Sequence, residues 1–285
     1  MNASDPLEKR IVDELQKTGY PTEIVSASIM QQRMWGVLHN PSYLDDMEGS
    51  SREFDIRAYH KWSFTTSGSD FVIGAYLIAE CKKSEKPWVF FVTPEEHTIA
   101  RYGELIKGRM ADKQIFATSD NPNSYISDES LRTFHHYFQK PHLARTFYEP
   151  FKGLEKSDTS QMIFSAVMSC IKATLFHHQD PPSQRWFRIY YPVIIFSGNL
   201  FEAQVDSNQN IALTPSGHVQ LSFSYMLPKR RPYASVWEGQ QRFIIDVVHE
   251  EFLEQFLEMI ETEHAILTEK LKTVKCAPKF GQYRN

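Results

Sequence analysis

Side chains able to hold a divalent cation occur at two places in this chain, at Asp55 and in the tripeptide Glu80-Cys81-Lys82. Two carboxylates a few ångströms apart repel each other by about 4 kcal/mol at an effective dielectric constant of about 20. A fold keeps such a pair when a cation lies between them or when one acid is neutral. Carboxylate oxygens are ligands of Mg²⁺ and Mn²⁺, and a lysine beside the metal can orient or deprotonate an attacking water. These residue types therefore predict metal-assisted hydrolysis.

Both motifs are predicted to lie on β-strands. In residues 53–58 the apolar side chains alternate with charged ones, as they do in a half-buried strand. An apolar run over residues 71–79 predicts a second strand, which ends abruptly in charge. A third apolar run, over residues 87–92, predicts another buried strand directly after the second motif. The order of these segments places the charged residues at strand ends.

A hairpin would bring the two motifs together. Successive side chains of a strand point to opposite faces, so Glu80 and Lys82 share a face while Cys81 points the other way. If residues 65–69 close a hairpin between the first two strands, Asp55 comes to lie beside Glu80 and Lys82. We therefore expect one site built from an aspartate, a glutamate and a lysine.

An acid, a long gap and then Glu-x-Lys resembles the active-site motif of the PD-(D/E)XK, or restriction-endonuclease-like, nuclease superfamily. The resemblance covers about residues 7–92. It implies that Asp55 and Glu80 are metal ligands and that Lys82 helps to activate water. The proline that the family places before the aspartate is absent, and Phe54 stands in its place. Members of the superfamily often lack this proline, so the departure weakens the resemblance little.

The resemblance implies an α/β fold with a restriction-endonuclease-like core, a central mixed sheet flanked by helices. It implies a phosphodiesterase dependent on Mg²⁺ or Mn²⁺, with DNA favoured over RNA as the substrate of an endonuclease. One alternative is a non-catalytic nucleic-acid-binding or assembly subunit that retains the nuclease fold, and another is an RNA-directed nuclease. Glu-x-Lys also arises by chance, and strand ends are often charged because they meet solvent. The motif by itself therefore does not decide between these functions.

Glu8 is a candidate third metal ligand. It stands in a helix predicted over residues 5–18, where Asp5 is a suitable N-cap. In one interpretation Glu8 closes a capping box with Asp5, which is a purely structural role. In the other it lies with Ile11 and Leu15 on the face that should meet the sheet, where an acid needs a partner. Many superfamily members carry a glutamate on this helix that joins the metal site, so the resemblance implies the second role.

The composition predicts one elaborated globular domain over residues 1–285. Hydrophobic residues make up 41% of the chain, and the net charge of −4 argues against a generally basic nucleic-acid binder. Three widely spaced cysteines predict neither a disulfide framework nor a zinc knuckle. The sequence has no apolar run long enough to span a membrane and no signal-peptide pattern. We therefore expect a soluble cytoplasmic protein without a membrane partner.

Affinity for nucleic acid must then come from local basic groups. Lys83 and Lys86 follow the second motif, and Lys229, Arg230 and Arg231 form a compact run between two prolines. Phosphate contacts dominate affinity and provide position rather than sequence reading. Each group can equally be a solvated surface segment, so the sequence leaves both interpretations open.

The second half of the chain is predicted to add to this core. Residues 111–156 are expected to be an inserted segment of helix and loop, and residues 189–272 to supply further strands and a final helix. Gly198 and Asn199 are predicted to make a tight hairpin into residues 200–205. The apolar face of the final helix packs either on the body or on a second copy of the chain. A homodimer through this helix is therefore a second predicted partnership.

Four further polar residues stand out. His135 and His136 invite a metal hypothesis, but adjacent positions on a helix diverge, which argues against a shared zinc ion. Asp246 interrupts an apolar run, where it can cap the next helix or pair with a buried base. Asp45, in an acidic turn, is expected to be solvated, with a metal ligand as the alternative.

Overall fold

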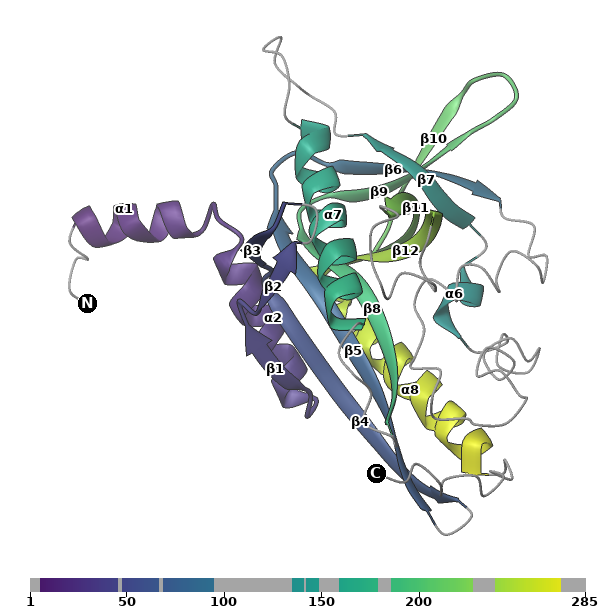
Figure 1. Cartoon of the computed structure of the whole chain (residues 1–285). Helices are drawn as coiled ribbons and strands as arrows, with labels where there is room; N and C mark the ends of the chain where they lie inside the picture. Colours follow the sequence, from purple (N-terminus) through teal and green to yellow (C-terminus); the bar gives the residue numbers. More distant parts are fainter. Residues whose placement is uncertain are drawn as a thin grey trace.

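The structure, a computed structural model, is built around one ten-stranded mixed sheet, with helices against both faces (Figure 1). It describes residues 6–45, 48–66, 69–94, 135–140, 142–148, 159–178, 186–227 and 239–272. The strands follow one another across the sheet in the order β1-β4-β5-β8-β12-β11-β7-β6-β9-β10. Their bounds are β1 (Gly36–His39), β4 (Ile56–Thr66), β5 (Ser69–Lys83), β6 (Trp88–Pro94), β7 (His142–Tyr148), β8 (Trp186–Ser197), β9 (Leu200–Val205), β10 (Ile211–Pro215), β11 (His218–Leu227) and β12 (Gly239–His249).

The smaller elements lie around this sheet. A separate two-stranded sheet pairs β2 (Ser42–Asp45) with β3 (Ser50–Glu53). The described helices are α1 (Pro6–Leu15), α2 (Tyr20–Gln32), α6 (His136–Gln139), α7 (Thr159–His178), the short 3₁₀ helix η2 (Glu250–Phe252) and α8 (Leu253–Lys272). None of these described helices combines the length and the apolar character needed to cross a membrane.

The predicted hairpin is confirmed. β4 and β5 pair antiparallel from Ile56 opposite Ala79 to Thr66 opposite Ser69. On its other side β5 runs parallel to β8, which in turn runs parallel to β12. A strand with neighbours on both edges and helices over both faces must be apolar throughout. The run at residues 71–79 has this character, and Leu77 is fully buried.

Helices cover the two faces with separate apolar cores. On one face α2 and α8 pack on the sheet, and Met30 and Phe256 are buried there among the strand side chains. On the other face α7 supplies Ile163 and Ile171 to a second core that includes Trp88. The apolar stripe of α8 is thus occupied by this chain's own sheet, and the homodimer through that helix stays a prediction.

The N-terminal helices differ from the expectation. The predicted first helix is α1, which extends away from the body (Figure 1) and has no buried residue. The helix that packs on the sheet is α2, which follows it. Its buried face consists of Thr22, Glu23, Ser26, Ala27 and Met30. Such small and polar residues produce no apolar period of 3.6, so the pattern of residues 20–32 did not predict a helix.

Two further predictions are wrong. The turn at Gly198 and Asn199 does not form a hairpin, because β8 lies between β5 and β12 while β9 lies between β6 and β10. The insertion expected over residues 111–156 contains β7, a strand of the main sheet between β11 and β6. Turn chemistry and local composition cannot show which strands become neighbours in a large sheet. Most of that segment lies outside the described residues.

Candidate active site

The candidate site lies where β5 ends, beside the start of β4. Asp55 stands at a bend directly before β4, so the antiparallel ladder has ended there. Its side chain replaces the missing backbone partner, because Cys81 N–H donates to Asp55 Oδ2 over 2.6 Å. The Asn40 amide in turn donates to the Asp55 carbonyl over 2.9 Å and fixes the bend. The aspartate is therefore held by backbone groups on both sides.

The structure brings the three predicted side chains together. Lys82 Nζ forms an ion pair with Glu80 Oε2 and lies 3.4 Å from Asp55 Oδ2. The same amine lies 3.3 Å from the carbonyl oxygen of Cys81. Glu80 and Lys82 share a face because they are two residues apart on one strand, and the hairpin register adds Asp55. Two carboxylates thus converge on one point, which the lysine amine occupies.

Burial differs among the three groups. Lys82 and Asp55 expose 24% and 27% of their side chains, whereas Glu80 exposes 7%. Burial raises the pKa of Glu80, and the nearby charge of Lys82 opposes that rise. Burial lowers the pKa of Lys82, but the attraction of Glu80 and Asp55 outweighs it and the net pKa is raised. The lysine is therefore a firmly held ammonium group at neutral pH.

Ser169 is a site residue that the sequence analysis missed. It lies on α7, and its hydroxyl donates to Glu80 Oε1, so both oxygens of this buried carboxylate have partners. Its signal in the sequence is weak. Ser165, Ser169 and Lys172 recur at i, i+4 and i+7 on a helix that is otherwise apolar nearly all round, which marks one polar stripe. That stripe predicts a polar neighbour on the sheet, although it does not say which one.

The donor set fits a divalent cation. Carboxylate oxygens are the ligands that Mg²⁺ and Mn²⁺ prefer, and the two acids face a common point that already holds a positive group. The Ser169 hydroxyl donates to Glu80 and the Cys81 amide donates to Asp55, so each carboxylate is held in position by one hydrogen bond. A cation bound there would displace the Lys82 amine from this point, and the flexible stem of the lysine would let the amine move aside.

Glu8 lies apart from these groups. It is exposed on α1, the helix without buried residues, so the face predicted to meet the sheet is turned to solvent. The buried glutamate near the site is Glu23 on α2. A Cβ placed on Gly19 would lie 3.1 Å from the Cys81 carbonyl oxygen, so α2 begins directly against this strand end. Burial and the charge of Asp55 raise the pKa of the Cys81 thiol, and the charge of Glu23 adds a smaller effect in the same direction.

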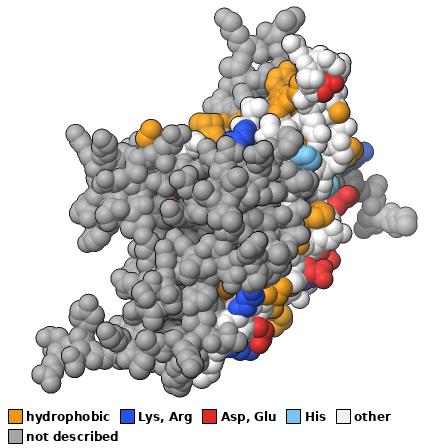
Figure 2. Space-filling model, turned by 90° about the vertical axis from the view of Figure 1, so that its right-hand side faces the viewer, with side chains coloured by type: hydrophobic (Ala, Val, Ile, Leu, Met, Phe, Trp, Pro, Cys, Tyr) orange, Lys and Arg blue, Asp and Glu red, His pale blue; other side chains and the backbone are white. Residues whose placement is uncertain are grey.

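The predicted nucleic-acid contacts are only partly described. Lys83 ends β5, and Lys86 follows a bend in which its amide donates to Ser84 Oγ over 3.0 Å. Both lie at the same end of the hairpin as the site. The run from Lys229 to Arg231 lies outside the described residues. On the face in Figure 2, the described side chains in view mix acidic, basic and hydrophobic types and form no continuous basic surface there.

Asp45 is not the solvated turn acid that was expected. It is buried, and Lys172 Nζ on α7 lies 2.6 Å from its Oδ2. Arg52 Nε on β3 approaches the same oxygen at 3.2 Å. Because two cations already neutralise this carboxylate, it ties the β2–β3 sheet to α7.

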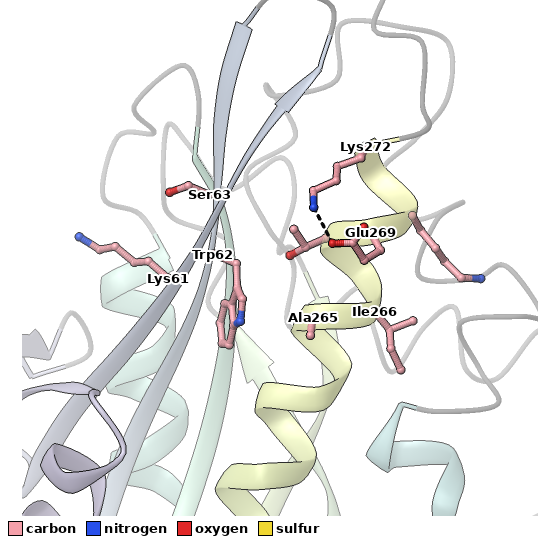
Figure 3. A pocket seen from close by; sticks show the side chains of 9 residues that line it. Lys61, Trp62, Ser63, Ala265, Ile266, Glu269 and Lys272 are labelled. Atoms are coloured by element: carbon pink, nitrogen blue, oxygen red, sulfur yellow. Dashed lines mark hydrogen bonds and ion pairs between the residues drawn. The ribbon is translucent and has the colours of Figure 1, made fainter.

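A groove of about 790 Å³ lies elsewhere on the molecule, between β4 and α8. Figure 3 shows Trp62 on its strand side and Glu269 with Lys272 on its helix side. Trp62 pairs with Ile73, well toward the turn of the hairpin, so the groove is remote from the strand end that carries the site. None of the three site residues lines it.

Comparisons with known proteins do not place this chain in a family. No protein-family model, no curated protein and no solved structure matches it. The case for a function therefore depends on the geometry of the site.

Proposed function

We propose that this protein is a divalent-metal-dependent phosphodiesterase that cleaves DNA on a restriction-endonuclease-like core. The observation that supports the proposal is the convergence of Asp55, Glu80 and Lys82 at one partly exposed strand end. These are the residue types, in the same chain order, of the motif that the sequence resembles. The α/β sheet flanked by helices is compatible with that core.

Each residue has a distinct part in the proposed reaction. Asp55 and Glu80 would hold Mg²⁺ or Mn²⁺. When bound, this ion would lower the pKa of a water and attract a phosphate oxygen. Lys82 stays protonated between the carboxylates, so we assign it to orienting the water and the phosphate by donation rather than to taking a proton. Ser169 keeps the Glu80 carboxylate in position.

Plasmid cleavage tests the proposal. Wild type with Mg²⁺ or Mn²⁺ is expected to nick or linearise DNA, and Asp55→Asn to lose this activity. Asparagine retains an oxygen for the Cys81 amide, so this variant removes the charge and little else. Lys61→Ala, an exposed lysine farther along the same hairpin, is the matched control and is expected to cleave like wild type. Equal cleavage by wild type and Asp55→Asn would refute the assignment.

One observation favours a second function. The Lys82 amine already pairs with both carboxylates, and an ion triad of this kind can persist without a metal. The alternative is a non-catalytic nucleic-acid-binding or assembly subunit that retains this fold. Calorimetry separates the enzyme from the binding subunit. The enzyme should bind Mn²⁺, and the Glu80→Gln variant should lose this binding. A binding subunit should show no such uptake, and an RNA-directed nuclease should take up Mn²⁺ and cleave RNA but not plasmid.

A further inference from the structure

A second group of charged side chains lies on the opposite face of the sheet, under α8. His136 on α6 and Glu263 on α8 are buried, and so is Asp246 on β12. His218 on β11 also reaches this group, with its Nε2 3.1 Å from Asp246 Oδ1. Asp246 thus pairs with buried bases, which was one of the two roles its sequence context left open.

His136 is held between two carboxylates. Its Nε2 lies 3.3 Å from Asp246 Oδ2, and its Nδ1 lies 2.6 Å from Glu263 Oε1. A neutral imidazole carries one N–H, so it can donate to only one of these acids. The other carboxylate oxygen would then face a nitrogen lone pair, and both are negative. One of the two contacts therefore calls for a further cation, either a proton on the ring or on a carboxylate, or a metal ion.

The neighbouring histidine favours the metal. His135 is the N-cap of α6 and has an extended backbone, so the divergence expected of adjacent helical positions does not occur. The rings of His135 and His136 instead stack with centroids 5.0 Å apart. His135 Nε2 lies 3.7 Å from Glu263 Oε2, a buried oxygen that accepts no hydrogen bond from the described residues. A second proton on His136 brings no closer donor to this oxygen, whereas one metal ion can bind both rings and the carboxylate together.

We propose that His135, His136 and Glu263 form a structural Zn²⁺ site. Two imidazole nitrogens and a carboxylate oxygen form a known three-ligand zinc set, in which a water completes the tetrahedron. One ligand atom from each of the three residues lies within 4.8 Å of the others. Zinc bonds of about 2.0–2.2 Å at tetrahedral angles place ligand atoms about 3.4 Å apart. His135 Nε2 must therefore move slightly closer to Glu263 Oε2, and His136 Nδ1 must withdraw slightly from Glu263 Oε1. Asp246, on the far nitrogen of His136, is the outer carboxylate that orients metal-binding histidines.

The site implies a structural role, with a small rearrangement on binding. His135 Nδ1 accepts a long hydrogen bond of 3.3 Å from the Tyr137 amide, and zinc at Nε2 would move the ring proton to Nδ1 and end that bond. His136 and Glu263 are almost fully buried, which leaves little room for a substrate. The ion would tie α6 to α8 and so fix the described segment 135–140 against the sheet.

A zinc titration tests this site without reference to DNA cleavage. The full-length chain, free of tags and stripped with a chelator, is titrated with Zn²⁺ by calorimetry in a Glu80→Gln background. That background removes uptake at the other candidate metal site. We expect one equivalent of Zn²⁺ and a higher midpoint of thermal unfolding. Co²⁺ in place of Zn²⁺ should show the visible absorption of a tetrahedral site.

Variants decide whether these residues are the ligands. His135→Gln should weaken Zn²⁺ binding by more than about tenfold, because even outer partners of zinc ligands cost 10–100-fold when removed. Glu263→Gln should do the same, and if it does not fold then His135→Gln decides. The matched control is His142→Gln on β7, which should bind Zn²⁺ like the background protein. No uptake, or uptake that His135→Gln leaves unchanged, overturns the proposal and assigns the cation between His136 and Glu263 to a proton.

Discussion

The two charged clusters on opposite faces of the sheet differ in their access to solvent. At the end of β5, Lys82 and Asp55 each expose about a quarter of their side chains. Under α8, His136 exposes 1% and Glu263 4%. Both clusters pair carboxylates with a base, so charge pairing by itself does not distinguish a site for chemistry from a structural one. Access does, because a substrate can reach only the first cluster.

The electrostatics of the two clusters are nevertheless alike. Burial lowers the pKa of His136, but the charges of Glu263 and Asp246 outweigh it and raise this pKa to about 9. The same balance raises the pKa of Lys82. In both places the acids hold a base in its charged form, and a divalent cation would compete with that charge. Substitutions in the two clusters should therefore affect different properties: the rate of cleavage at the end of β5, and the free energy of unfolding under α8.

The largest expected effect is on catalysis. Lys82→Ala should lower the rate of DNA cleavage by about 10²–10³-fold, the usual cost of removing one positioned hydrogen-bond donor from an active site. His136→Gln should leave the rate of the folded protein within a few-fold of wild type, and so should Glu8→Gln on the exposed helix α1. Single-turnover cleavage at saturating Mg²⁺ measures this. A comparable loss in His136→Gln would erase the distinction between the clusters.

The order should reverse for stability. His136→Ala leaves Glu263 and Asp246 buried without their shared base, so we expect a loss of about 3–5 kcal/mol in the free energy of unfolding. Asp55→Asn, at a partly exposed position, should cost about 1 kcal/mol or less. Urea denaturation at pH 7.5 in the presence of a chelator compares the two variants. Similar losses would mean that both clusters are structural.

Ser169→Ala should have an intermediate effect. It removes the hydroxyl that donates to Glu80 Oε1, and a hydrogen bond to a charged group contributes about 1.5–3 kcal/mol. If Ser169 positions a ligand, the variant should also need more Mn²⁺ for half-maximal cleavage. Ser165→Ala, one turn away on the exposed side of α7, is the control. A purely structural serine would change stability without moving the Mn²⁺ requirement.

The smallest effect concerns pH. His60 lies between Trp35 and Trp62, and burial lowers its pKa from the ordinary value. Its neutral form is therefore favoured in the folded chain, and it should cost a little stability as the pH falls below about 6.5. NMR titration in a chelator should find the His60 pKa below that of an unfolded histidine and the His136 pKa above it. A raised pKa for His60 would show that the charge of Glu261 outweighs burial at this position.

Part of the cluster at the end of β5 could be predicted, because the positions of its residues follow from local sequence patterns. Alternation over residues 53–58 and the apolar run over residues 71–79 predict two strands, and a period of two puts Glu80 and Lys82 on one face. A short connection makes antiparallel pairing of these strands the natural outcome, and the pairing brings in Asp55. Glu8 failed the same test, because an amphipathic pattern does not say which surface its apolar face meets.

The cluster under α8 could not be predicted, since its residues come from four separate elements, α6, β11, β12 and α8. Their encounter follows from the strand order and from the seat of α8 on the sheet, which local periodicity does not encode. The extended backbone at His135 reversed the argument that adjacent histidines diverge. Covalent geometry puts residues i and i+2 of a strand on the same face, so the sequence determined this part of the site. A residue's neighbours across layers are set by the packing of whole elements, and only the tertiary structure decided them.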